Sequence, residues 1–335
     1  MESKNIDRLN LFLIIFSLII AYKIPFELFL FSYAFLGPLH YLTEINWLKE
    51  RNYFIKTKEW IWTFILFGLI ISVPFLMTLP LFKFIYEIKV VKDFLMTLNA
   101  SSNVILLASL FFSIGLVFLK ELKLTIVFLI SSILLSYLIL KYVTFSLVLV
   151  SVFLPTVIHV YLFTWLFMLF GAMKSRSTPG YIGVVLLAIV PIVIAYGNVH
   201  PDQYVLSQGT KDNYLSSGFY ALNSSLAKSL VGIQNESFSL LSLIGIKIQI
   251  FIAFAYTYHY LNWFSKTSII GWHKGSSKMR LGIIATLWIA SIGFYLYDYH
   301  TGIIVLFFLS FLHVFLEFPL NVVSIKGISE GLFKK

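Results

Sequence analysis

The sequence predicts an all-α protein, a polytopic transmembrane helical bundle. Hydrophobic residues make up 59% of the 335 residues and charged residues only 12%, and the mean hydropathy is +0.90, far from the balance of a soluble domain. Apolar runs of about 18 to 25 residues recur along the chain, each long enough to cross a bilayer. No small-residue cleavage site follows the first run, so we expect no cleaved signal peptide.

Ten spans are expected, and eight or nine crossings are the alternative because the first and fifth runs are short. We expect a single integral membrane domain over residues 1–335, with 199–239 as an external surface loop rich in Ser, Asn, Gly and Tyr. Within that loop a weakly amphipathic stretch, Tyr214 to Val231, is expected to lie on the membrane surface. The spans are 9–22, 26–48, 60–82, 94–119, 124–140, 144–173, 180–198, 239–264, 279–297 and 302–323.

The basic residues predict the orientation. Lys and Arg gather in the connections after the second, fourth, sixth, eighth and tenth spans, and such clusters favour the cytoplasmic side. Both termini are therefore expected in the cytoplasm, in a cell membrane. The connection after the third span, with Lys83, Lys89 and Lys92, disagrees with this pattern. The formal charge of +10 is thus explained by topology, and no nucleic-acid partner is expected.

Several kinds of chemistry are excluded by what the sequence lacks. The chain has no cysteine, so it has no disulfide, no thiolate nucleophile and no cysteine ligand for a metal. No phosphate-binding loop, G-x-S-x-G turn or H-E-x-x-H helix is present. Any metal site must therefore use histidine, carboxylate or other nitrogen and oxygen ligands.

Four histidines fall inside predicted spans. His40, His159, His259 and His313 lie in the second, sixth, eighth and tenth spans, which all run from outside to inside. Counting to the next basic cluster places them ~10 to 22 Å from the cytoplasmic boundary, at 1.5 Å rise per residue. Four helices could thus bring their imidazoles to one layer. The other histidines fall in connections: His200 and His300 at the outer surface and His273 in a cytoplasmic loop.

Two carboxylates accompany these histidines. Glu44 follows His40 by four residues and Glu317 follows His313 by four, so each pair projects from one helix face. Ionisable groups inside a membrane are costly unless they bind or pair with something. We therefore predict a metal site with the ligands His40, His159, His259, His313, Glu44 and Glu317, the carboxylates either coordinating or orienting imidazoles.

Polar and aromatic neighbours complete the predicted site. The hydrogen-bonding candidates around the ligands are Tyr41, Thr43, Tyr258, Tyr260 and Asn262. The tripeptide at 40–42 recurs at 259–261, each time followed by an Asn-Trp pair. Imidazole and carboxylate ligands without sulfur suit non-heme iron, and zinc, manganese, copper or heme are compatible with the same residues.

The chain resembles the bacterial Brp/Blh-type β-carotene dioxygenases, on its polytopic, nearly loop-free architecture and on His40, His159, His259 and His313. The resemblance implies one iron ion held by histidines and the cleavage of a carotenoid with dioxygen. In that family two histidines lie one turn apart, whereas His40 and His313 are followed at that spacing by Glu.

The expected function is thus a membrane non-heme iron oxygenase acting on a carotenoid or other apolar, lipid-like substrate. A proton-coupled transporter, a b-type heme protein and a non-catalytic membrane scaffold are the alternatives.

Overall fold

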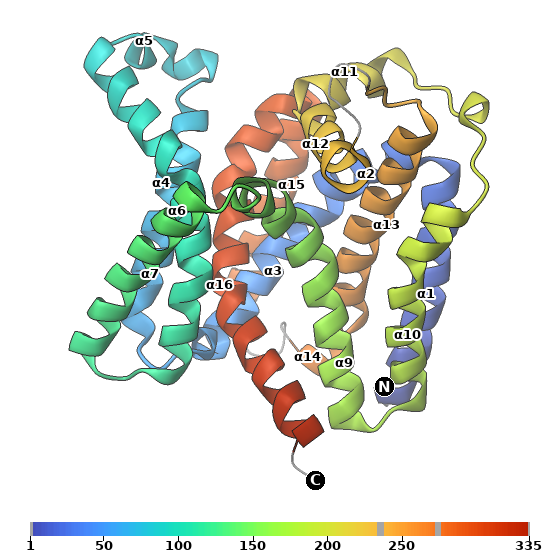
Figure 1. Ribbon diagram of the computed structural model, residues 1–335, viewed down its shortest axis with the longest axis horizontal. Helices are drawn as coiled ribbons and strands as arrows, with labels where there is room; N and C mark the ends of the chain where they lie inside the picture. The colour runs from blue at the N-terminus through green and yellow to red at the C-terminus, as the bar shows by residue number, and fades with distance from the viewer. Residues whose placement is uncertain (1–2, 233–237, 272–275, 334–335) are drawn as a thin grey trace. The chain divides into compact units, whose positions relative to one another are not determined.

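The computed structural model describes residues 3–232, 238–271 and 276–333 (Figure 1). None of these residues lies in a strand, and most are helical. The helices are α1 (Ser3–Lys23), α2 (Pro25–Phe31), α3 (Gly37–Glu50), α4 (Ile61–Leu76), α5 (Lys83–Tyr86), α6 (Lys89–Phe118), α7 (Leu122–Tyr142), α8 (Ser146–Val148), α9 (Thr164–Ser175), α10 (Thr178–Tyr196), α11 (Gln208–Ser216), α12 (Phe219–Val231), α13 (Leu243–Ser265), α14 (Thr267–Ile270), α15 (Lys278–Tyr297) and α16 (Tyr299–Phe333).

The prediction of a multi-span helical membrane protein is confirmed at this level. Across the described parts of the chain, eight helical stretches are long and apolar enough to cross a membrane. The expected spans 26–48 and 239–264 are not among them. The first is divided between α2, a wide turn and α3. The second corresponds to the 23-residue α13, whose apolar character is reduced by Lys247, Gln249, His259 and Asn262.

Wide π-helical turns interrupt two of the helices and carry or precede candidate ligands. Residues Ser32–Leu36 form one such turn, in which the Gly37 N–H donates to the Ser32 carbonyl five residues back. Pro38 follows and has no N–H with which to continue the usual i→i−4 ladder. A longer π-helical stretch, Leu149–Phe163, contains Pro155 and His159. Wide turns of this kind are frequent at functional sites.

The chain divides into two compact units. Unit 1 comprises residues 1–40, 152–281 and 327–335, and unit 2 comprises 41–151 and 282–326. In unit 1, α1 packs against α13 and α10, α2 packs against α13, and α9 packs against α10 (Figure 1). The Ser32 and Thr257 hydroxyls lie 2.8 Å apart and join the first wide turn to α13. Close packing of this kind fixes how these helices face each other.

The segment expected as an external loop contains two helices with a buried polar network beneath them. α11 contacts α2, and α12 contacts α13. Gln249 of α13 accepts hydrogen bonds from the Tyr214 hydroxyl (2.5 Å) and Asn223 Nδ2 (2.9 Å), and donates to the Pro25 carbonyl (3.0 Å). The amphipathic stretch is therefore held by the helices of its own unit, with a break at Gly218, where φ is +75°.

Unit 2 is built around α6, which packs against both α4 and α7 (Figure 1). A Cβ added to Gly115 of α6 would lie 2.4 Å from the ring of Phe128 on α7, so only glycine permits this approach. α16 also packs against α4, because Phe315 lies beside Phe64 with ring centroids 6.4 Å apart. This packing positions the part of α16 that carries His313 and Glu317.

Candidate metal centre

Three of the four predicted histidines meet inside unit 1. His40 comes from the first turn of α3, His159 from the π-helical stretch and His259 from α13. The Nε2 atoms of His40 and His259 lie 3.0 Å apart, and the ring centroids of His159 and His259 are 5.3 Å apart. All three are buried, with 1%, 2% and 6% of their surface exposed. The structure thus brings His40, His159 and His259 together in unit 1.

A threonine determines the tautomer of His259. The Thr164 hydroxyl lies 2.8 Å from the Val160 carbonyl and 2.7 Å from His259 Nδ1. A carbonyl can only accept, so the single hydroxyl hydrogen is donated to Val160. His259 Nδ1–H must then donate to Thr164. The Nε2 lone pair of His259 is left facing His40.

This arrangement fits a bound metal ion. Metal-ligating imidazoles almost always donate their second N–H to an acceptor, as His259 does to Thr164. With metal–nitrogen bonds of about 2.1 Å, two adjacent ligands are about 3.0 Å apart in octahedral geometry and about 3.4 Å apart in tetrahedral geometry. The 3.0 Å between His40 Nε2 and His259 Nε2 is a hydrogen-bond distance, and it is also the separation of adjacent octahedral ligands.

Two side chains of unit 1 hold the wide helical stretch against α10. The Tyr161 hydroxyl donates to the Leu187 carbonyl, and Trp165 Nε1 donates to the Val184 carbonyl at 3.0 Å. Leu187 is four residues before Pro191, which lacks the N–H that would normally reach that carbonyl. The freed carbonyl thus anchors the segment between His159 and Thr164.

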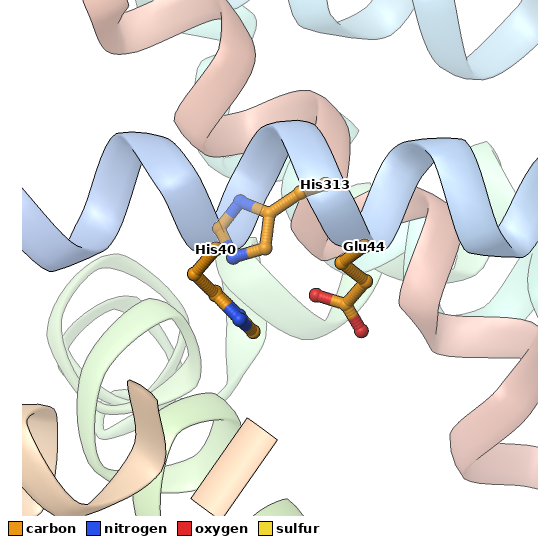
Figure 2. Close-up of side chains that lie close together, drawn as sticks. All are labelled: His40, Glu44 and His313. Carbon is orange, nitrogen blue, oxygen red and sulfur yellow. The ribbon is translucent and has the colours of Figure 1, made fainter. Parts of the chain in front are cut away.

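The fourth histidine lies in unit 2 with both carboxylates. A ligand atom of His313 on α16 lies within 4.8 Å of one on Glu44 of α3, and the Tyr41 ring stacks on the His313 ring at 4.2 Å. Glu317 follows His313 by one turn on α16 and is buried. His40 precedes Glu44 by one turn and projects to the same side of α3 (Figure 2).

No known relative identifies the site. No protein-family model, curated protein or solved structure matches the chain.

The predicted neighbours divide into those near the histidines and those directed elsewhere. The Tyr260 ring lies 5.2 Å from the His40 ring. The Tyr258 hydroxyl instead donates to Asn10 Oδ1 (3.3 Å) and contacts Met168 Sδ (3.0 Å). Asn262 is buried one turn after His259, and within the described residues its Oδ1 accepts no hydrogen bond. Thr43 is fully buried on α3.

The histidines expected in connections are placed as follows. His200 and His300 are exposed, which agrees with their prediction as surface residues. His273 lies outside the described residues. Neither of the two described histidines belongs to either cluster.

Two residues of the site were not predicted from the sequence. Thr164 orients His259, and Trp263 lies edge-on to His40 at 5.5 Å. Trp263 stands four residues after His259, a spacing that places both on one face of α13 and could have indicated it. Thr164 carries no comparable signal, because a threonine in a span usually bonds to its own helix.

Proposed function

We propose that this protein is an intramembrane metalloenzyme of the non-heme iron oxygenase type, acting on a carotenoid or other lipid-phase substrate. The observation that carries the proposal is the 3.0 Å approach of His40 Nε2 and His259 Nε2, with Thr164 holding the second nitrogen of His259. His159, whose ring centroid lies 5.3 Å from that of His259 in the same unit, is proposed as the third ligand. Imidazole ligands of this kind suit iron, and a bound iron ion would supply the redox chemistry with dioxygen.

The surroundings of the histidines favour an apolar substrate. The rings of Tyr260 and Trp263 lie beside His40, and the cluster lies within helices whose sequence is dominated by apolar residues. A polar substrate would lose its hydration on entering such a site without regaining hydrogen bonds. An alkene or isoprenoid chain would lose little.

A heme with His40 and His259 as its two axial ligands is not favoured. Two axial bonds of about 2.1 Å in line would separate the nitrogen atoms by about 4.2 Å. The observed separation is 3.0 Å, and the rings meet edge to face at 76° with centroids 4.6 Å apart. This contact leaves no room for a macrocycle between the two imidazoles.

The proposal is tested first by metal content. Wild-type protein purified in detergent should hold about one iron ion per chain and show no Soret band. The variants His40→Ala, His159→Ala and His259→Ala should each lose most of it, whereas His200→Ala should retain it. Absence of stoichiometric metal in folded wild type would overturn the proposal and leave a proton path through these histidines as the leading alternative.

The substrate class is tested separately. Iron-loaded protein should bleach β-carotene in mixed micelles in the presence of dioxygen, and His259→Ala should not. Stoichiometric iron without bleaching of any polyene would keep the metal centre and reject the substrate class.

A further inference from the structure

We propose that the connection between α4 and α6 is a lipid-binding surface, which inserts apolar side chains into the membrane surface and binds anionic head groups with lysines. The surface comprises residues 77–96, here called the interfacial segment, and includes α5 and the first two turns of α6. It lies entirely in unit 2 and contains no histidine. The inference is therefore independent of the proposed function.

The interfacial segment exposes large apolar side chains outside the packed helices. Leu81, Phe84 and Val90 expose 74%, 71% and 78% of their surface. Phe94 is also mostly exposed and follows Val90 by one turn, so the two lie on one face of α6. Exposed apolar patches of this kind mark a surface that binds a partner or a membrane.

The position of the segment points to the membrane. Both helical stretches that it joins are long and apolar enough to cross a bilayer, so their connection falls at a bilayer surface. The 30 residues of α6 measure about 45 Å at 1.5 Å per residue, whereas the hydrocarbon core is only about 30 Å thick. Lys120 follows the other end of α6 and marks the opposite boundary. The first turns of α6 therefore reach the layer of the head groups.

The charges of the segment suit an anionic lipid. It carries three lysines, at 83, 89 and 92, against the two carboxylates of Glu87 and Asp93. Lys83 Nζ lies 3.8 Å from Glu87 Oε1. Within the part of the chain that the structure describes, neither Lys89 nor Lys92 forms an ion pair. These two exposed lysines are thus available to lipid phosphates, which attract basic side chains at a membrane surface.

The segment has a defined backbone that suits the interface. The Glu87 N–H donates to the Lys83 carbonyl at 3.0 Å, and the Lys92 N–H donates to the Ile88 carbonyl at 2.9 Å. Lys92 Nζ also lies 5.9 Å from the centre of the Tyr86 ring, which joins α5 to α6. Backbone groups that are already hydrogen-bonded enter an apolar layer at low cost. Large apolar side chains combined with lysines are typical of helices that lie in the interface.

A lipid fits this surface better than a second copy of the chain. A two-fold contact would place the same patch, with the same lysines, against itself. Lipid head groups supply the opposite charge instead. Binding to head groups also explains why these lysines depart from the pattern that predicts the orientation of the chain.

The first test locates the segment in lipid vesicles that contain the full chain. Because the chain has no cysteine, one introduced cysteine carries one environment-sensitive fluorophore. At Phe84→Cys the fluorophore should be quenched by lipids that are spin-labelled near the head group and shielded from aqueous iodide. Glu59→Cys is the matched control, because Glu59 is exposed in the connection at the other end of α4, next to Lys58. Iodide should quench the fluorophore there.

The second test measures head-group selectivity with the fluorophore at Phe84→Cys. Spin-labelled phosphatidylglycerol should bind beside it more tightly than spin-labelled phosphatidylcholine, by about fivefold for each unpaired lysine at low salt. Adding Lys89→Gln and Lys92→Gln should abolish this preference. Adding Lys83→Gln instead should lower it less, because Lys83 is already paired with Glu87.

Each outcome decides the inference. Equal iodide quenching at positions 84 and 59 would place the segment in water and overturn the inference. Equal quenching by the two lipids, or an unchanged preference after the loss of Lys89 and Lys92, would overturn it as well. If Phe84→Cys does not fold, Leu81→Cys takes its place, because Leu81 is similarly exposed. None of these results depends on the iron content of the histidines.

Discussion

Replacing Thr164 by valine tests the assigned role of this residue. Valine has nearly the same shape but no oxygen, so His259 Nδ1–H loses the acceptor that it has at 2.7 Å. Because Thr164 and His259 are both buried, water cannot take its place. Leaving a buried donor unsatisfied costs about 1–3 kcal/mol.

The effect on metal binding follows from the same bond. Loss of a group that orients a ligating imidazole usually lowers metal affinity about 10- to 100-fold, equivalent to roughly 1.4–2.7 kcal/mol. Thr164→Val should therefore weaken iron binding by this factor, measured by competition with a chelator in detergent. Thr164→Ser keeps the hydroxyl and should restore most of the affinity.

The matched control is Thr156→Val. Thr156 lies in the same π-helical stretch and donates to the Val152 carbonyl in the same way that Thr164 donates to Val160. Among the described residues it makes no hydrogen bond to a histidine. Thr156→Val therefore shows the effect of losing only the hydrogen bond within the helix. If Thr164→Val bound iron as tightly as Thr156→Val, within threefold, the tautomer argument would be refuted.

Three further predictions concern other parts of the chain. His200→Ala and His300→Ala should keep the full iron content by elemental analysis, because both side chains are exposed; loss of iron in either would show that the cluster is wrongly assigned. Gln249→Leu should lower the free energy of unfolding by at least about 1–3 kcal/mol, the cost of one unsatisfied buried group, because three hydrogen bonds are lost; an unchanged urea midpoint would contradict this. Asp298→Ala should cost about 1 kcal/mol, because Asp298 caps α16 by accepting from the Thr301 hydroxyl (2.6 Å) and N–H (2.7 Å). The bond from the Thr301 hydroxyl, and after it the bond from the Thr301 N–H, hold the pKa of Asp298 below its usual 3.8. The stability difference between wild type and Asp298→Ala should therefore be complete above pH 3.8. It should disappear as the pH falls through the lowered pKa.

The class of the protein and its six candidate ligands could be predicted from the sequence alone. Both follow from local properties: an apolar run must be helical in a bilayer, because its backbone polar groups find no other partners there. A histidine or glutamate in such a run costs free energy to bury, so its presence there indicates a functional site. His40, His159, His259, His313, Glu44 and Glu317 were all predicted on this ground, and all six are buried.

The span count shows where this local argument weakens. The run at 26–48 contains Gly37 and Pro38, and the structure divides it with a wide turn at Ser32–Leu36. In α13, the polar residues that build contacts within unit 1 are the ones that lower its apolar character. Hydropathy alone cannot distinguish a helix that faces lipid from one that is surrounded by its own protein.

Which of these residues come into contact depends on how the helices pack. An α-helix turns about 100° per residue, so the extra residue of each wide turn redirects every side chain that follows it, and His159 lies inside such a stretch. The direction in which each side chain leaves α13 also matters. It brings the Tyr260 ring beside His40, and it brings the hydroxyl of its near neighbour Tyr258 to Asn10. Thr164 acquires its role only because α13 packs where His259 can reach it, and such a contact between residues 95 positions apart is absent from any local pattern.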